Sequence, residues 1–318
     1  MRSQAALGGA AAIALLVMAG IAAGDDDGYE RGQLAWQEVQ RSYLLHVPPA
    51  ARDAALPLVI ALHGAGGTGG SFAEETRFGT AADQRKMFVV FPDGTEMTPG
   101  RNTWNAQFCC GTAAALKVDD IGFIGALIDH LASRYKIDRT RVYATGMSNG
   151  AMMSYQLAAA HPEWFAAIAP VAGTIGGMTR EGKDYIIPMP KEKVPVMIIH
   201  GRKDPYVRFD GGSSSALKFP YRWKMSAADS LSFWAAVDGC DPMEVASEPV
   251  AGKLRRISYP NCQDGSEVVL WEIEDGEHNW PGEDVRFPAP DGKTRSAAAE
   301  ILAFFAAHRS GQGAHAER

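Results

Sequence analysis

A short run in the middle of the chain, residues 142–150, most constrains how this sequence can fold. The strand-like stretch Val142 to Thr145 leads directly into residues 146–150 (GMSNG), and a helix-forming segment, Ala151 to Ala160, follows. G-x-S-x-G between a strand and a helix is typical of a tight turn that exposes the serine hydroxyl at the carboxyl end of a sheet. The pattern predicts that Ser148 is a nucleophile. A chance match is the alternative in a chain with 34 glycines, and the flanking elements argue against it.

The first 23 residues differ from the rest of the chain. Arg2 gives a short basic start, residues 10–21 are apolar, and small residues followed by acidic residues 25–27 come next. This order predicts a secretory signal peptide. A membrane anchor is the alternative, but Gly and Ala dilute the apolar run. We therefore expect a secreted or periplasmic protein without stable membrane insertion after the leader is removed, whereas its oligomeric state is not indicated.

Charge and cysteine content indicate which partners, metal sites and disulfides the protein can have. The formal net charge is −6, and no cluster of Lys and Arg is long enough to hold a phosphate backbone, so we expect no nucleic-acid partner. The four cysteines lack the C-x-x-C spacing of a zinc site. Export favours disulfides. We pair Cys240 with Cys262, which flank a predicted strand over 254–259, whereas the adjacent Cys109 and Cys110 could form a vicinal bridge or remain thiols.

Strand-like and helix-like runs alternate from residue 41 onward, which predicts an α/β fold whose central sheet is mostly parallel and has helices on both faces. We expect an N-terminal extension over 24–40, one catalytic domain over 41–309 and a flexible tail over 310–318. The expected strands are 44–48, 58–62, 87–91, 142–145, 168–171, 194–199 and 268–273, and the expected helices include 72–86, a helix from Ile121 to Tyr135, and 298–308.

A serine hydroxyl is a poor nucleophile at neutral pH, so Ser148 would need a histidine as general base and a carboxylate that fixes its tautomer. In an α/β-hydrolase these residues follow the order serine, acid, histidine. His278 lies in a loop of turn formers after the last predicted strand, and we predict it as the base, with a plain loop residue as the alternative. Asp204, just beyond the strand 194–199, is the predicted acid. Asp210 is the alternative, and either could be an ordinary turn aspartate.

Such a serine also needs two N–H groups to hold the oxyanion. Asn149, directly after Ser148, supplies the first by position. The glycine-rich residues 62–70 (LHGAGGTGG) follow a predicted strand and supply the second, from Ala65 or from the neighbouring Gly66. A phosphate-binding loop is the competing interpretation, but the run lacks a G-K-[ST] ending.

Four segments together resemble the secreted esterases grouped as carbohydrate esterase family 1 and the polyhydroxybutyrate-depolymerase-like esterases. They are the His63-Gly64 loop, residues 118–123 (VDDIGF), residues 146–153 (GMSNGAMM) and residues 278–282 (HNWPG), and they occur in family order. The resemblance spans roughly residues 41–308. It implies an α/β-hydrolase fold and hydrolysis of carboxylic esters, in a group that includes feruloyl esterases, acetylxylan esterases and depolymerases of short-chain polyesters.

Carried over by motif, the resemblance implies Ser148 as nucleophile, Asp204 as acid and His278 as base, and it also favours the bridge between Cys240 and Cys262. The chain departs from the family pattern at Asn279, where a threonine often stands, and we expect no appended carbohydrate-binding or polyester-binding module. Both departures leave the substrate open.

Trp280 and Trp104 are the predicted substrate-binding residues, since aromatic side chains often line pockets, with ordinary packing as the alternative. We expect a serine carboxylic-ester hydrolase for feruloyl, acetyl or similar short or aromatic acyl esters, either small molecules or polymers, that needs no metal or cofactor. A depolymerase of poly(3-hydroxybutyrate) or its oligomers is the first alternative. A secreted serine peptidase and a non-catalytic binding protein on the same scaffold are the others.

Overall fold

The computed structural model describes residues 28–310, apart from residues 53, 217–221 and 251. The predicted leader and nearly all of the predicted tail therefore lie outside the described residues. Within the described residues, no helix is both long and apolar enough to cross a membrane.

A ten-stranded sheet forms the centre of the molecule. Its strands are Tyr29–Trp36 (β1), Val39–His46 (β2), Leu56–Leu62 (β3), Phe88–Pro92 (β4), Ile137–Met147 (β7), Ala167–Val171 (β8), Val196–Gly201 (β11), Ala246–Val250 (β14), Leu254–Tyr259 (β15) and Val268–Ile273 (β16). They are ordered β1-β2-β4-β3-β7-β8-β11-β16-β15-β14. The run from β4 to β16 is parallel throughout, and the two strands at each edge are antiparallel. The mostly parallel sheet predicted from the sequence is confirmed.

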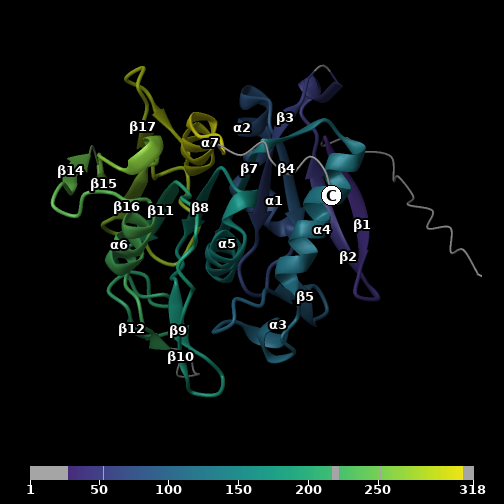
Figure 1. The fold of residues 1–318 in the computed structure, drawn as a ribbon, viewed down its shortest axis with the longest axis horizontal. Coiled ribbons are helices and arrows are strands. Elements are labelled where there is room, and N and C mark those ends of the chain that lie inside the picture. Colours follow the sequence, from purple (N-terminus) through teal and green to yellow (C-terminus); the bar gives the residue numbers. More distant parts are fainter. Residues whose placement is uncertain (1–27, 53, 217–221, 251, 311–318) are drawn as a thin grey trace, which may run out of the picture.

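Helices cover both faces of this sheet because each parallel strand presents apolar side chains in both directions. Along β3, Leu58 and Ile60 join a core cluster on one face, whereas Val59 and Ala61 join a second cluster on the other. The first cluster includes buried residues of Asp120–Arg134 (α4), Asn149–Ala160 (α5) and Ala227–Val237 (α6). The second includes buried residues of Gly69–Thr76 (α1), Phe78–Arg85 (α2) and Ala297–Ala307 (α7). Figure 1 shows α4 and α5 lying across the strands.

Smaller elements lie between the strands of the main sheet. Figure 1 shows several of them gathered at its lower end, which is where β7 runs into α5. A four-stranded sheet in the order β10-β9-β13-β12 is formed by short strands that follow β8 and β11 in the chain. These elements are Thr95–Thr98 (β5), Arg101–Thr103 (β6), Gly111–Ala115 (α3), Gly176–Met178 (β9), Asp184–Ile186 (β10), Gly212–Ser213 (β12), Arg222–Trp223 (β13), Phe287–Pro288 (β17), Thr294–Arg295 (β18) and the 3₁₀ turns Pro49–Arg52 (η1), Pro162–Trp164 (η2) and Gln263–Gly265 (η3).

Two parts of the predicted element order differ from the structure. The single helix expected over 72–86 is two helices, because Arg77 takes a left-handed φ of 52° and ends α1. The residues expected to form an extension over 24–40 include β1, which pairs with β2 along its whole length and forms one edge of the sheet. An edge strand with one partly exposed face lacks the continuous apolar run by which the central strands are recognised.

Candidate active site

Ser148 lies on a tight turn between β7 and α5, as the sequence pattern predicts. Its φ of 55° and ψ of −116° are a conformation that residues other than glycine rarely adopt. The two motif glycines allow the turn to pack against the end of β3. A Cβ atom on Gly146 would lie 2.6 Å from the carbonyl oxygen of Leu62, and one on Gly150 would collide with the same oxygen. Strained turns held in this way are concentrated at functional sites.

Two neighbouring loops bring a carboxylate and an imidazole to this end of the sheet. Asp204 follows β11 and His278 follows β16, and the two strands are parallel neighbours. The backbone N–H of Lys203 donates to the carbonyl oxygen of Gly276 at 2.9 Å and ties the loops together. A Cβ atom on Gly276 would lie 2.8 Å from the Cα of Gly201, so a larger residue there would push the loops apart.

The three side chains predicted to act together lie in one hydrogen-bonded row. His278 Nε2 is 2.9 Å from Ser148 Oγ, and His278 Nδ1 is 2.7 Å from Asp204 Oδ2. A carboxylate can only accept, so Nδ1 carries a proton and Nε2 of a neutral imidazole is left to accept from the serine hydroxyl. The Asp204 side chain is fully buried and that of His278 is 13% exposed. Asp210, the alternative acid, is exposed.

Asp204 receives donors on both of its oxygens. The backbone N–H groups of Tyr206 and Val207 each donate to Oδ1 at 2.8 Å. His200 Nε2 lies 3.4 Å from Oδ2, on the oxygen that also receives His278. Burial by itself would raise the pKa of Asp204, but the hydrogen bonds and charges of His200 and His278 lower that pKa to about 2. Asp204 is therefore an anion at neutral pH.

His200 is a buried imidazole in β11 that was not among the predicted site residues. Its side chain is 1% exposed, and Nε2 is 2.8 Å from the carbonyl oxygen of Val207. Because a carbonyl only accepts, this nitrogen carries a proton, which also points to the neighbouring carboxylate of Asp204. The signal in the sequence was the spacing of a histidine four positions before the predicted acid, at the end of an apolar strand.

The two amides predicted to hold an oxyanion belong to residues on either side of Ser148: Asn149 at the start of α5 and Ala65 in the loop after β3. Asn149 is the first residue of α5, where a helix leaves its N–H groups without intrahelical acceptors. In the glycine-rich loop, Gly66 N–H donates to the carbonyl oxygen of Asn102 at 2.8 Å. The amide of Gly66, which was the alternative to that of Ala65, is therefore already hydrogen-bonded. The loop passes close to the elbow, since a Cβ atom on Gly64 would lie 3.6 Å from the Cβ of the serine.

Trp104 links both of these amide-bearing segments. Its backbone N–H donates to Asn149 Oδ1 at 2.7 Å, and Asn149 Nδ2 donates back to the Trp104 carbonyl oxygen at 3.0 Å. Its indole N–H donates to the carbonyl oxygen of His63 at 3.0 Å. His63 is itself fixed, because Gly94 N–H donates to Nε2 at 3.0 Å and Nδ1 bonds the Gly64 carbonyl oxygen at 2.7 Å. Burial lowers the pKa of His63, which keeps this imidazole neutral.

The segment that carries Trp104 is hydrogen-bonded to a buried ion pair between Arg41 and Asp120. Arg41 donates to Asp120 Oδ1 at 2.9 Å, and Asn105 N–H donates to Oδ2 at 2.8 Å. Asp119 and Asp120 stand next to each other at the start of α4. Asp119 caps α4 by accepting from Gly122 N–H at 2.9 Å, whereas Asp120 turns inward to the ion pair.

The two tryptophans predicted to contact substrate are both in the core. Trp104 has no exposed surface, and Trp280 is 6% exposed. The Trp280 indole meets the rings of Phe72 and Phe78 with centroids 5.5 Å apart in both cases. Buried packing was the alternative considered for both residues, and the structure favours it. The aromatic ring next to the imidazole is instead that of Tyr206, which is 41% exposed and centred 5.1 Å from His278.

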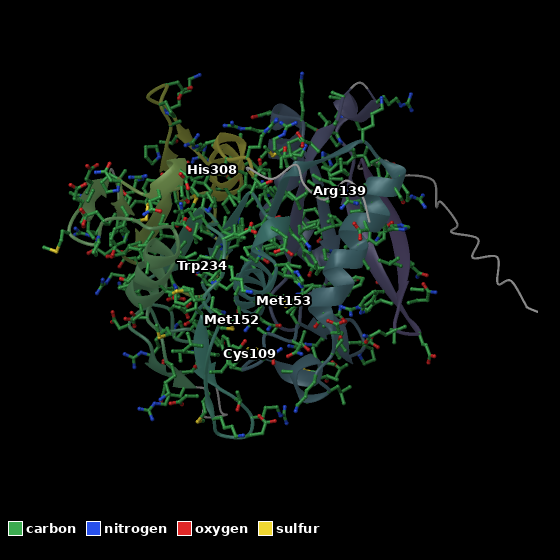
Figure 2. All side chains as sticks on the ribbon, in the orientation of Figure 1. Cys109, Arg139, Met152, Met153, Trp234 and His308 are labelled. Carbon is green, nitrogen blue, oxygen red and sulfur yellow. A yellow bond between two sulfur atoms is a disulfide. The ribbon has the colours of Figure 1, made fainter. Side chains whose placement is uncertain are left out.

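The structure joins Cys240 to Cys262 in the predicted disulfide, with a sulfur separation of 1.99 Å. The sulfur atoms of Cys109 and Cys110, whose state the sequence left open, lie next to each other. Cys109 belongs to a buried apolar cluster beside the start of α5, and Figure 2 labels it near Met152 of the same cluster. Within the described residues, no three His, Cys, Asp or Glu side chains are grouped so that they could hold a metal ion.

Comparison with known proteins gives this site its family context. Residues 41–213 match the family described as "Esterase PHB depolymerase". NocK of Nocardia uniformis subsp. tsuyamanensis, itself named only as a candidate esterase, is 30% identical over 76% of this chain and 71% of its own length. Feruloyl esterase B of Piromyces equi is 28% identical over 71% of this chain, and poly(3-hydroxyalkanoate) depolymerase C of Paucimonas lemoignei is 32% identical over 40%.

These relatives differ in how much of their length is matched. The chain spans 40% of the feruloyl esterase and 30% of the depolymerase. Among solved structures, an acetyl xylan esterase from Aspergillus awamori aligns with a TM-score of 0.59 at 16% identity, over 80% of this chain and 96% of the other. At that identity the likeness concerns the fold, which is that of an α/β-hydrolase. The match over more than half of the sequence shows that this chain belongs to the PHB-depolymerase esterase family, a group of carboxylic ester hydrolases.

Proposed function

We propose that this protein is an exported serine esterase that works through an acyl-enzyme formed on Ser148. His278 takes the proton of the Ser148 hydroxyl as the oxygen attacks the ester carbonyl, and Asp204 holds the imidazole in the required tautomer and stabilises its protonated form. The imidazolium then gives its proton to the leaving alcohol. Water, deprotonated by the same imidazole, attacks the acyl-enzyme and releases the acid.

The observation that carries this proposal is the hydrogen-bonded row of 2.9 Å and 2.7 Å from Ser148 through His278 to an ionised Asp204. The N–H groups of Asn149 and Ala65 are the proposed donors to the oxyanion that forms in each step. Their positions on either side of the elbow support this role, because Asn149 directly follows the serine and the loop of Ala65 approaches its side chain.

For the substrate, we propose esters of short or aromatic acids, with feruloyl and acetyl groups as the leading cases. Support comes from relatives that are named as feruloyl esterases and acetylxylan esterases. Hydroxyalkanoate oligomers are a second candidate, favoured by the 32% identical depolymerase from Paucimonas lemoignei. Export is supported by the disulfide between Cys240 and Cys262, since such bonds persist in oxidising compartments.

Labelling and hydrolysis test the serine mechanism. A fluorophosphonate probe should label the wild-type protein on Ser148, and Ser148→Ala should abolish labelling together with hydrolysis of p-nitrophenyl acetate. A Ser148→Ala protein that cleaved this ester at the wild-type rate would refute the proposal. Rates on methyl ferulate and on a hydroxybutyrate trimer would then rank the two substrate classes.

A further inference from the structure

Tyr206 is an exposed aromatic ring held in a fixed place beside the reactive imidazole. Its backbone N–H donates to Asp204 Oδ1 at 2.8 Å, and its carbonyl oxygen accepts from the indole N–H of Trp223 at 2.6 Å. The next residue, Val207, is buried in the apolar cluster beside α5. These contacts all involve the backbone or the following residue. None of these three contacts uses the Tyr206 side chain, and 41% of the residue surface is exposed.

The strand order defines which side of the scissile bond this ring faces. Ser148 follows β7, the loop of Ala65 follows β3 on one side of it, and His278 follows β16 on the other side. In the proposed reaction the ester carbonyl oxygen points to the Ala65 loop, and the leaving oxygen must face His278, which protonates it. Tyr206 follows β11, on the His278 side, with its ring 5.1 Å from the imidazole and tilted by 35°.

From this placement we propose that Tyr206 is a specificity-determining residue that contacts the alcohol part of the ester, and that it favours alcohols whose ring offers an apolar face. Tyrosine stacks on such faces, and both the carbon-bound hydrogens of a sugar ring and an aryl ring provide them. The inference rests on the proposed esterase function and adds to it the side of the site on which the alcohol is recognised. A contact of this kind acts before the alcohol leaves, so it affects acylation and not hydrolysis of the acyl-enzyme.

Acetate esters that differ only in the alcohol isolate this contact. Ethyl acetate, phenyl acetate and xylose tetraacetate all yield the same acetyl-enzyme. In Tyr206→Ala, the ratio of kcat/KM for a ring ester to kcat/KM for ethyl acetate should fall by roughly three- to tenfold, the range expected for one aromatic contact. Tyr206→Phe, which keeps the ring, should restore that ratio. The phenyl and xylose arms identify which kind of ring is recognised, and a selective loss in either arm supports the inference.

Two further measurements make the test decisive. The breakdown rate of acetyl-enzyme, followed after a burst, should be the same in Tyr206→Ala and the wild type. Met243→Ala removes an apolar side chain that is 88% exposed and should leave every ratio unchanged. Equal losses on all three esters in Tyr206→Ala, or a slower breakdown of acetyl-enzyme, would overturn the inference. Absence of fluorophosphonate labelling in the wild type would instead overturn the proposed function, and the inference with it.

Discussion

Replacement of Trp104 by phenylalanine tests whether this buried indole positions the oxyanion-binding loop. The change removes the indole N–H that donates to the carbonyl oxygen of His63 at 3.0 Å. Trp234 offers a matched control, because it is also fully buried, and its indole nitrogen has no hydrogen-bond partner within the described part of the chain. Trp234 belongs to α6, and Figure 2 labels it between α6 and α5. The same atoms are deleted in Trp104→Phe and Trp234→Phe, so the cavity left behind contributes similarly to both.

The two variants should therefore differ by the hydrogen bond alone. Trp104→Phe leaves a buried carbonyl oxygen without this donor, which costs about 1–3 kcal/mol. Trp234→Phe deletes a buried donor that lacks an acceptor, which offsets part of the packing loss by a similar amount. We expect Trp104→Phe to be less stable than Trp234→Phe by about 2–6 kcal/mol, measured as the free energy of unfolding from urea titrations with a common slope.

We also expect Trp104→Phe to lower the catalytic activity more than Trp234→Phe does. His63 lies two residues before Ala65, the proposed oxyanion donor. Complete loss of such a donor lowers kcat by about 10²–10³, so a displaced loop should lower kcat on p-nitrophenyl acetate by roughly tenfold in Trp104→Phe. Trp234→Phe should retain the wild-type kcat. Equal unfolding free energies and equal kcat values in the two variants would refute a positioning role for Trp104.

Two further predictions concern ionised groups. His200→Phe removes a hydrogen-bond donor to Asp204. Because the pKa of Asp204 is about 2 in the folded protein and 3.8 in the unfolded chain, its ionisation stabilises the folded state above pH 3.8, and this stability is lost as the pH falls towards 2. The midpoint of acid unfolding, followed by tryptophan fluorescence, should therefore rise, and an unchanged midpoint would contradict the role of His200. Burial raises the pKa of Asp238 to about 7, so its ionisation makes the folded protein less stable as pH rises from about 4 to 7. Asp238→Asn should remove this loss of stability, which is on the order of 4 kcal/mol between about pH 4 and pH 7. If the wild type and the variant had the same pH dependence of stability, this role of Asp238 would be excluded.

The sequence carries strong signals for the parts of the fold that are buried on both sides. Continuous apolar runs marked the central strands, and the spacing of glycines around Ser148 marked the elbow, because both follow from local sterics and burial. The break at Arg77 had no such signal. A single residue in the left-handed region depends on how α1 and α2 pack, and an arginine is not a residue that usually marks it.

The aromatic residues of the site show why contacts are harder to predict than elements. Trp104 and Trp280 were chosen for their type and their proximity to motifs in the sequence. In the structure, hydrogen bonds orient Trp104 inward to Asn149, and Phe72 and Phe78 enclose Trp280. Whether a large ring faces solvent or core is decided by what lies across from it, which is not a local property of the chain.

The site contains two buried hydrogen-bonded networks, one on each side of the elbow. On one side, Trp104 and His63 hold the amides that would stabilise developing charge. On the other, His200 and two backbone amides hold the carboxylate of Asp204 that orients the imidazole. The proposed reaction of Ser148 requires both, because an attacking oxygen needs a proton acceptor and donors to the oxyanion at the same time. Each half of the site is held by its own contacts, and the serine between them has a φ of 55°, a strained conformation of the kind that is concentrated at functional sites. Gly146 and Gly150 allow the turn between the two networks to pack against the carbonyl oxygen of Leu62. The two networks have different tasks in the proposed reaction, so neither could replace the other.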